Sequence, residues 1–402
     1  MEEKKLVPKR RFKGYYKDWL ELSLKDFRDE SDIYSYTGGP FGSDLKTEDY
    51  TKTGVRIIQL QNIGDGFFSN SYKIYTSEEK AESLSSNLIF PDDIIIAKMA
   101  EPLARAAIIP QYEEKYLMAS DGIRLKVDKK RFNNYFILTL INHDKFRNKA
   151  LENSTGTTRK RIGLVTLGNL RSYVPEYDEQ QKIGEFFKVL DQRIANQERK
   201  ITKVKALKSA YLNEMLPQKG ENVPKRRFKG YTEKWNYCLL KEVINSEFKG
   251  KAKAEMQGGN SPYLDTNYLN GGEISYVNLP NDVEKDDVLI LWDGSQAGMV
   301  YHGFEGALGS TLKAYKPKYS GEFLYQFLKK NQKVIFEQYR TPNIPHVINT
   351  FVDEFWICMP SIEEQQKIGQ FFKNLDDQIA IEEKKLEKLK QMKEAYLEEM
   401  FV

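Results

Sequence analysis

Residues 179–212 read EQQKIGEFFKVLDQRIANQERKITKVKALKSAYL, and residues 364–397 repeat the pattern as EQQKIGQFFKNLDDQIAIEEKKLEKLKQMKEAYL. In both copies the apolar residues recur at steps of three and four for most of the length, the spacing of a coiled-coil seam. Pro175 and Pro360 precede the copies, and Pro217 and Gly220 follow the first one, where helix breakers belong. The sequence therefore predicts two long helices. The first seam comprises Ile183, Phe187, Leu190, Ile194, Ile201, Val204, Leu207, Tyr211 and Met215, and the second comprises Ile368, Phe372, Leu375, Ile379, Leu386, Leu389, Met392, Tyr396 and Met400.

The two helices are expected to pair with each other. Residues 179–215 carry eight cations and five acids, whereas residues 364–400 carry seven cations and nine acids, so their net charges have opposite sign. Gln197 and Glu382 occupy matched seam positions, and polar residues there fix the register of a coiled coil at some cost in stability. If the two halves of the chain are related by a pseudo-twofold axis, the helices run antiparallel.

A second repeat marks the start of each half. Residues 7–15 and 223–231 both read VPKRRFKGY, and Trp19 and Trp235 follow at equal distance. The two copies are 216 residues apart, whereas the helical copies are 185 apart, so the stretch between the repeats is 31 residues longer in the first half. The chain thus has one frame and two variable inserts. By symmetry, the end of the second helix should lie close to the first VPKRRFKGY.

Composition narrows the protein class. The 402 residues include 40% hydrophobic and 30% charged residues, which is typical of a folded water-soluble protein of two or three domains. The sequence has no run of about 18 apolar residues and no secretory signal at its N-terminus. Cys238 and Cys358 are too few for a disulfide framework. We therefore expect a cytoplasmic protein.

Both inserts are expected to be mixed α/β. Runs of branched apolar residues bounded by Gly, Pro and Asp predict strands at residues 54–62, 93–98 and 121–127, and their counterparts at 287–292 and 310–315. Residues 132–140 and 322–334 are expected to be helical. Each insert would then contain a buried strand, a glycine-bearing loop, a second strand and a helix.

Catalytic motifs are missing from the sequence. There is no G-x-x-x-x-G-K-[ST] phosphate loop, no Asn-Pro-Pro-aromatic tetrapeptide and no methyl-donor glycine loop after a strand. His143, His302 and His346 are far apart, which argues against a zinc site. Pro91-Asp92 followed by Asp128-Lys129-Lys130 loosely resembles a nuclease pattern, but a turn before a buried strand explains the first of these segments better. We therefore predict no catalytic residues and no metal site.

Polar and basic loops are the better candidates for chemistry. Residues 145–173 contain seven cations and one acid, and this segment could face a phosphate backbone or form an ordinary solvated surface. Loops at 37–43 and 154–161 in the first insert, and at 293–298 and 339–346 in the second, carry side chains that hydrogen-bond bases or phosphates. The candidate DNA-binding residues are Ser43, Lys46, Arg105, Thr157, Thr158, Arg159, Lys160, Arg161, Lys251, Lys253, Ser295, Gln296, Arg340, Asn343 and His346.

Taken in order, these features resemble the specificity subunit of type I restriction-modification enzymes. The resemblance rests on PFGS after Gly39, on GVRIIQLQNI at 54–63, on the D-x-I/L-I strands, on a Thr-x-x-Arg loop and on the doubled P-x-x-x-E-Q-Q-K-I-G helix starts. It covers essentially the whole chain. The second insert departs from it, because KGKAKAEMQGGN at 249–260 replaces the PFGS segment, which makes the start of that insert the hardest part to align.

The resemblance implies two target recognition domains, at residues 1–175 and 217–360, and two antiparallel spacer helices, at 176–216 and 361–402. Each domain would read one half of a split double-stranded DNA target. Partner methyltransferase and restriction subunits would carry S-adenosylmethionine, ATP and Mg, with no cofactor in this chain. The alternatives are a single-chain methyltransferase or nuclease with a fused reader, and a coiled-coil adaptor without DNA specificity. The residues expected to bind partners on the helices are Gln180, Gln181, Phe186, Gln365, Gln366 and Phe371.

Overall fold

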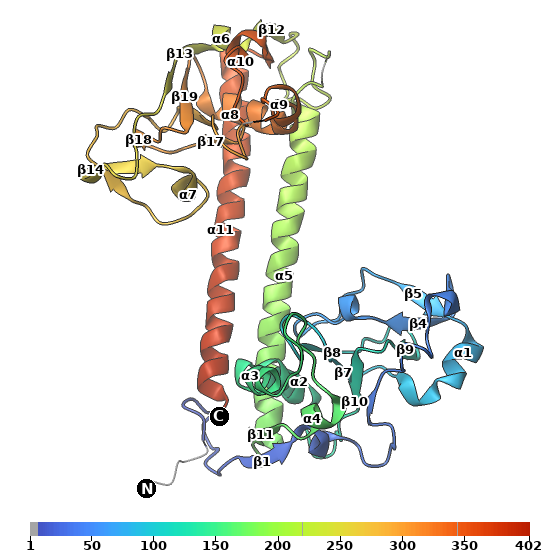
Figure 1. The fold of residues 1–402 in the computed structure, drawn as a ribbon. Coiled ribbons are helices and arrows are strands. Elements are labelled where there is room, and N and C mark those ends of the chain that lie inside the picture. Colours follow the sequence, from blue (N-terminus) through green and yellow to red (C-terminus); the bar gives the residue numbers. More distant parts are fainter. Residues whose placement is uncertain (1–6, 219, 344) are drawn as a thin grey trace. The chain divides into compact units, whose positions relative to one another are not determined.

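A computed structural model describes residues 7–218, 220–343 and 345–402. The chain forms two compact units. Unit 1 contains the residues up to 196 together with 386–402, and unit 2 contains 197–385. The predicted long helices are present as α5 (Tyr177–Met215) and α11 (Ile362–Met400), each 39 residues long. Each unit therefore contains one portion of each helix, and Figure 1 labels the elements.

Unit 1 is built on three sheets. A four-stranded sheet has the order β2-β10-β7-β8, a five-stranded sheet has the order β3-β5-β4-β9-β6, and β1 pairs with β11. Helices α2 and α3 cover the four-stranded sheet on the side of α5 (Figure 1). The strands are β1 Leu20–Ser23, β2 Tyr36–Gly38, β3 Tyr50–Thr51, β4 Val55–Ile58, β5 Ile74–Thr76, β6 Leu88–Ile89, β7 Ile94–Ala97, β8 Ala106–Ile108, β9 Tyr116–Met118, β10 Gly122–Leu125 and β11 Arg171–Val174; the helices are α1 Glu78–Ser83, α2 Asn134–Asn142, α3 Asp144–Glu152 and α4 Leu164–Gly168.

Unit 2 repeats this plan with a smaller second sheet. Its four-stranded sheet has the order β13-β19-β16-β17, its other sheet has the order β15-β14-β18, and β12 pairs with β20. The strands are β12 Asn236–Leu239, β13 Ile244–Lys249, β14 Gln257–Leu264, β15 Tyr276–Val277, β16 Val288–Leu291, β17 Val300–His302, β18 Ala307–Leu308, β19 Leu312–Pro317 and β20 Trp356–Met359; the helices are α6 Leu240–Val243, α7 Thr266–Leu269, α8 Gly321–Lys330, α9 Gln332–Gln338 and α10 Phe351–Glu354.

The strand orders show what the extra 31 residues of the first insert build. Strands β2, β10, β7 and β8 correspond to β13, β19, β16 and β17, and the parallel pair β4–β9 corresponds to β14–β18. Strands β3 and β6 and helix α1 have no counterpart among the described elements of unit 2. The additional chain therefore enlarges the second sheet and leaves the strand order of the four-stranded sheet unchanged.

The predicted strands and helices are present, with three differences at their ends. Strand β4 stops at Ile58, because the Asn62 side chain accepts a hydrogen bond from the Gln59 N–H and folds residues 60–62 into a helical turn. Helix α2 begins after Asn133, whose side chain caps it by accepting from the Phe136 N–H. The helix expected at 322–334 is two helices that meet at Asn331.

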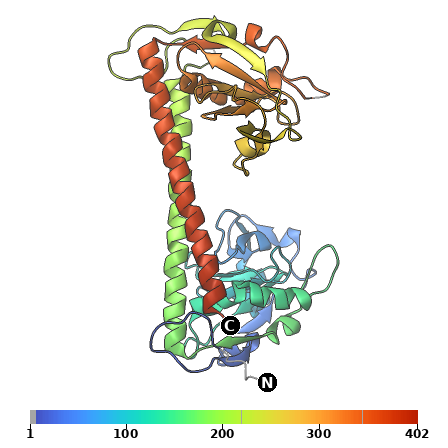
Figure 2. The same ribbon diagram turned by 90° about the vertical axis from the view of Figure 1, so that its left-hand side faces the viewer.

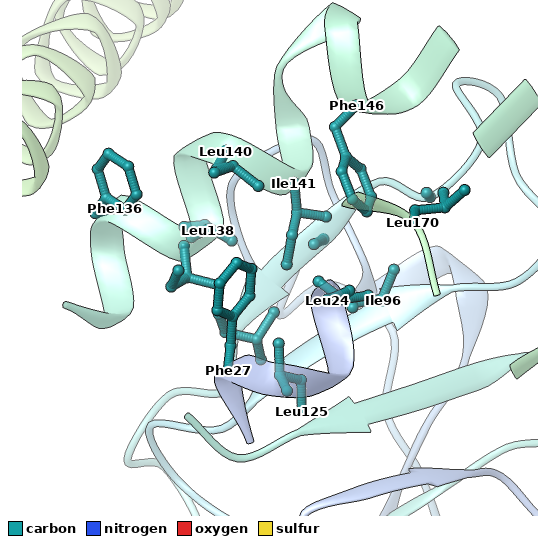
Figure 3. Packing of buried hydrophobic residues seen from close by; sticks show 14 of the residues in the cluster. Leu24, Phe27, Ile96, Leu125, Phe136, Leu138, Leu140, Ile141, Phe146 and Leu170 are labelled. Carbon is teal, nitrogen blue, oxygen red and sulfur yellow. The ribbon is translucent and has the colours of Figure 1, made fainter. Parts of the chain in front are cut away.

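The apolar core of each unit joins the four-stranded sheet to the long helices. In unit 1, Leu24, Phe27 and Leu125 pack against α2 side chains such as Ile141 (Figure 3). The same cluster includes Met400 and Phe401 at the end of α11. The unit 2 cluster correspondingly includes Met215 and Leu216 at the end of α5. Each recognition insert is thus fused to its helices through one continuous core, so the helix positions and the sheet position are set together.

The two tryptophans of the repeats lie under these helix ends. Trp19 is buried and packs edge-on against Phe136 of α2 and Phe401 after α11, with ring centroids 5.9 and 6.1 Å apart. Trp235 packs in the same way against Phe323 of α8, at 5.8 Å. The C-terminal end of α11 therefore belongs to the core of unit 1, on the side of the first VPKRRFKGY, as symmetry predicts and Figure 2 shows.

In each half of the chain, the VPKRRFKGY segment binds the EQQKIG segment at the start of a long helix. The Arg11 guanidinium forms two hydrogen bonds of 2.7 Å with the Glu179 carboxylate at the start of α5. Arg227 forms the equivalent pair with Glu364 at the start of α11, at 2.7 and 2.6 Å. Glu179 and Glu364 are at most 1% exposed. The second arginine of each VPKRRFKGY thus clamps the buried glutamate of its own EQQKIG through two hydrogen bonds.

The preceding arginine of each repeat reaches the other helix. Arg10 pairs with Glu399 near the end of α11, and its backbone N–H donates to the Glu399 carbonyl at 2.8 Å. Arg226 pairs in the same way with Glu214 near the end of α5, where the backbone bond is 2.9 Å. One short segment in each unit thus ties the beginning of one long helix to the end of the other.

Within each unit the helices run antiparallel, as predicted. In unit 2, Lys205 pairs with Glu383 and Lys208 with Asp376, so rising numbers on α5 meet falling numbers on α11. The two polar seam residues also contact each other, since Gln197 Nε2 donates to Glu382 Oε2 at 2.7 Å.

The seam prediction is wrong at one position in each helix. Leu207 and its counterpart Met392 are exposed. Two helices bury only a narrow strip between them, and these side chains lie outside that strip.

Removing the clamp should destabilise the fold strongly. Replacing Arg11 with Met leaves the buried Glu179 carboxylate without its charged partner, which costs about 3–5 kcal/mol in such pairs. The matched control is Arg10→Met, because its ion pair is partly exposed and is worth at most about 1 kcal/mol. Urea unfolding of the full chain measures both. Equal losses for the two variants would contradict the clamp.

The seam pair predicts an acid-sensitive contribution to stability. Hydrogen bonds from Gln197, Lys200 and Lys385 lower the pKa of Glu382 from 4.5 to about 2. A depressed folded-state pKa stabilises the protein above pH 4.5, and this stabilisation is lost as the pH falls toward 2. Unfolding midpoints of wild type and Glu382→Gln should therefore differ above pH 4.5 and converge below it. A constant difference down to pH 2 would show that the ionised carboxylate is not the source.

Candidate nucleic-acid interface

One edge of the four-stranded sheet gathers the polar loops of unit 1. Strands β2 and β7 end there and β10 begins there, because β10 is antiparallel to both. Gly39 follows β2, Lys98 follows β7 and Asp121 precedes β10. Residues 155–161 form a hairpin, and the Ile162 N–H after it donates to the Lys98 carbonyl at 3.0 Å. The predicted loops 37–43 and 154–161 therefore reach the same edge.

Unit 2 has the same edge. Lys249 ends β13 and Trp292 follows β16. Val347 forms a β-bridge with Arg340, and its N–H donates to the Trp292 carbonyl at 2.9 Å. The predicted loops 293–298 and 339–346 meet here, since the Gly294 N–H donates to the Pro345 carbonyl at 2.9 Å. Both inserts thus present a sheet edge of the same construction. We call it the recognition edge: it lies at the ends of β2 and β7 in unit 1 and at the ends of β13 and β16 in unit 2.

The structure aligns the segments that the sequence left unaligned. An added Cβ at Gly39 would lie 1.9 Å from the Ala119 carbonyl oxygen, and one at Gly250 would lie 2.1 Å from the Gly309 carbonyl oxygen. The two glycines follow β2 and β13, and their N–H groups donate to Gly122 and Leu312 across the sheet. KGKAKAEMQGGN therefore replaces GGPFGS at the same place, and a close backbone approach requires the shared glycine.

The loop after Gly39 carries an exposed aromatic ring. Pro40 and Leu45 are buried at its ends, while Phe41 is 83% exposed. Ser43 and Lys46 are exposed in the same loop. Both predicted residues are therefore accessible at or next to the recognition edge.

The cations of the basic hairpin at 155–161 differ in whether they have an acidic partner. Thr157, Thr158, Arg159 and Lys160 are exposed, and among the described residues Arg159 and Lys160 have no acidic partner. Arg161 instead pairs with Asp121 at the edge. Arg159 and Lys160 are the cations of this hairpin that remain available to a phosphate.

The rest of the basic segment at 145–173 has partners inside unit 1. Arg147 is buried with Asp65, and Arg171 pairs with Glu21. The ammonium groups of Lys145 and Lys149 donate to carbonyls of residues 401 and 171. These contacts stabilise the fold, so the seven cations do not form one free surface.

Several other predicted residues have internal contacts. Arg105 is half-buried and donates to the Leu60 and Glu101 carbonyls. Arg340 donates to the carbonyls of Ser295 and Ala297, which ties the two loops of unit 2 together. His346 lies 3.0 Å from Thr341 Oγ1 through Nδ1. These residues shape the edges. The remaining predicted residues of unit 2 are exposed there: Lys251, Lys253, Ser295, Gln296 and Asn343.

The helix residues expected to bind partners fall into two groups. Gln180 and Gln365 are buried and donate to the Pro175 and Pro360 carbonyls at 2.9 and 3.0 Å, so their side chains serve the helix starts. Gln181 and Gln366 are exposed. Phe186 lines an apolar groove of about 550 Å³ in unit 1, and Phe371 packs against Phe228 and Tyr211 in unit 2.

Comparison with known proteins identifies the family. The model of the type I restriction modification DNA specificity domain matches residues 40–206 and again 232–391. The chain belongs to this family.

Two curated relatives come from Methanocaldococcus jannaschii. The type I restriction enzyme MjaVIII specificity subunit is 31% identical over 180 residues, or 42% of each chain. The match to this relative therefore spans less than half of its length. A putative type I restriction enzyme MjaX specificity subunit is 20% identical over 362 residues, or 85% of each chain.

Solved structures share the fold of this specificity-domain protein. The S subunit of a type I restriction-modification system from M. genitalium superposes with a TM-score of 0.68 at 18% identity and covers 98% of this chain and 99% of its own. A chain from a structural study of type I R-M complex assembly has a TM-score of 0.52 at 16% identity, with 94% and 96% covered. At these identities the likeness shows the fold alone.

Two further properties of this specificity-domain protein concern only the residues that the structure describes. None of their helices is long and apolar enough to span a membrane. They contain no group of three or more His, Cys, Asp or Glu side chains placed to hold a metal ion.

The close approach at Gly39 generates a prediction. Gly39→Ala should destabilise unit 1 by about 1–3 kcal/mol, because the new methyl group overlaps the Ala119 carbonyl and must displace backbone. Gly42→Ala in the same loop is the control, since a Cβ there meets nothing within 4 Å and should change stability by less than about 0.5 kcal/mol. Thermal unfolding of both variants measures the two changes in stability. Equal behaviour would show that the loop relaxes freely around residue 39.

Proposed function

We propose that this chain is the DNA-sequence-reading subunit of a type I restriction-modification complex. Unit 1 reads one half of a split target and unit 2 reads the other. The observation that carries this proposal is the repeated recognition edge, built with the same strand order on the same frame but lined by different side chains. Family membership over both inserts supports it.

The edges suit DNA because they combine two kinds of donor. Exposed Arg159 and Lys160 provide charge for phosphates, which fix the position of a protein on a duplex without reading its sequence. Ser, Gln and Asn side chains such as Ser295, Gln296 and Asn343 provide donors and acceptors for base edges. The chain itself acts as a reader and scaffold and carries no catalytic group.

We further propose that methyltransferase subunits bind the helix frame and that restriction subunits join that core. The groove in unit 1 supports this, because Val189 and Met392 expose apolar surface there beside Phe186 and Tyr396. S-adenosylmethionine, ATP and Mg would be bound by those partners. The complex would act in the cytoplasm, where its DNA target lies.

Methylome sequencing of a host with and without this gene tests the function. A bipartite methylated motif should appear only with the gene. Replacing residues 20–174 with the corresponding insert of a relative should then change one half of the motif and leave the other intact. A motif that stays the same with and without the gene would overturn the proposal, and loss of both halves together would overturn the assignment of one half-site to each unit.

The free cations predict a change in salt dependence. Arg159→Ala combined with Lys160→Ala should weaken binding of the assembled methyltransferase to DNA and reduce the slope of log affinity against log salt by about 2, roughly 0.9 for each lost phosphate contact. The control is Arg171→Ala, which removes a cation already paired with Glu21. Titration at several salt concentrations measures the slopes. An unchanged slope in the double variant would show that this hairpin faces away from DNA.

A further inference from the structure

Lys98 holds a fixed place at the recognition edge of unit 1. Its backbone N–H donates to the Asp121 carbonyl at 2.8 Å, and its carbonyl accepts from the Ile162 N–H at 3.0 Å. Its ammonium donates to the Ser120 carbonyl at 3.0 Å. A Cβ added at Gly38 would lie 2.8 Å from the ammonium nitrogen, so the lysine occupies the space that the glycine leaves open.

The charge of this ammonium is poorly compensated. Among the described residues no carboxylate lies within ion-pair distance of Lys98. The neighbouring Asp121 pairs with Arg161 instead. Burial and the nearby Arg161 lower the pKa of Lys98, and the Asp121 carboxylate only partly offsets them. A lysine has three N–H donors, and Ser120 accepts one of them. This half-buried group is therefore short of acceptors.

The lysine at the corresponding edge of unit 2 has an acidic partner. Lys249 stands at the position of Gly38, and Trp292 at the position of Lys98, as the strand registers show. The Lys249 ammonium is neutralised by Asp293, with the two atoms 2.7 Å apart. The corresponding edge thus presents a lysine with spare donors in unit 1 and a lysine–aspartate pair in unit 2.

We propose that Lys98 reads a base in the half-site bound by unit 1, by donating hydrogen bonds to acceptors in the major groove. The inference rests on the proposed function of the chain as a DNA reader. Guanine is the base that fits best, because its O6 and N7 atoms offer two adjacent acceptors to a lysine. Arg159 and Lys160 are exposed on the hairpin and suit phosphates, whereas Lys98 is half-buried at the sheet edge.

The test uses the complete methyltransferase complex and duplexes that carry its methylome motif. Each position of the unit 1 half-site is replaced in turn, and methylation rates are compared for wild type, Lys98→Met, Lys98→Arg and the control Lys160→Met. Lys98→Met should lose about 10- to 100-fold discrimination at one position and keep it elsewhere. Lys98→Arg should retain a preference there, and Lys160→Met should slow all duplexes alike.

A modified base separates reading from a structural role. Replacing the guanine at that position with 7-deazaguanine removes the N7 acceptor. The wild-type complex should then lose rate, whereas Lys98→Met should be insensitive to the change. If Lys98→Met does not fold, the Lys98→Arg complex is compared with wild type on the 7-deazaguanine duplex. Both should lose rate there if the side chain at position 98 reads N7, and no loss in either would contradict the inference. Unchanged discrimination, or a uniform loss across all duplexes, would overturn the inference. Failure of wild type to show any bipartite motif would instead overturn the proposed function.

Discussion

The fold depends on a buried ion pair that is made twice. Arg11 with Glu179, and Arg227 with Glu364, hold the repeated segments against the first turn of each long helix. Arginine suits this place because its planar fork satisfies both carboxylate oxygens at once, so that a deeply buried acid is left with no unpaired charge. A carboxylate in the first turn also complements the positive end of the helix dipole. The Pro-flanked helix starts are thereby fixed in both units.

A rigid frame allows the inserts to diverge. The glycine in each EQQKIG shows how tightly frame and insert pack: a Cβ at Gly184 would lie 2.3 Å from the Asn133 side chain that caps α2. Helix α2 in turn shares a core with the four-stranded sheet. The position of the sheet edge is therefore determined by the helix, while the side chains on the loops are free to change. This division explains how the two edges have the same strand order and different chemistry.

The two units also neutralise charge differently beneath their edges. In unit 1, Arg124 on β10 is buried between Asp93 and Asp32, at 2.6 and 2.9 Å. Unit 2 has Ala314 at the corresponding register position, and its Asp287 accepts from the Glu284 N–H at 2.9 Å and lies 3.9 Å from the Lys316 ammonium. Burial raises the pKa of both Asp93 and Asp287. Variation in these inserts thus extends from the exposed loops into the sheet itself.

The sequence by itself determined the frame. Its helices, their antiparallel pairing and the seam positions of Gln197 and Glu382 follow from periodicity, charge and the repeats, which are local or symmetric signals. The strands at 93–98 and 287–292 were also predictable from their apolar runs. Only the tertiary structure decided which cations are free, because Arg161, Arg147 and Arg171 find acidic partners far away in the sequence. Lys98 was missed for the same reason: its meaning depends on Gly38 and Ser120, which the fold brings to one edge and no spacing in the chain reveals.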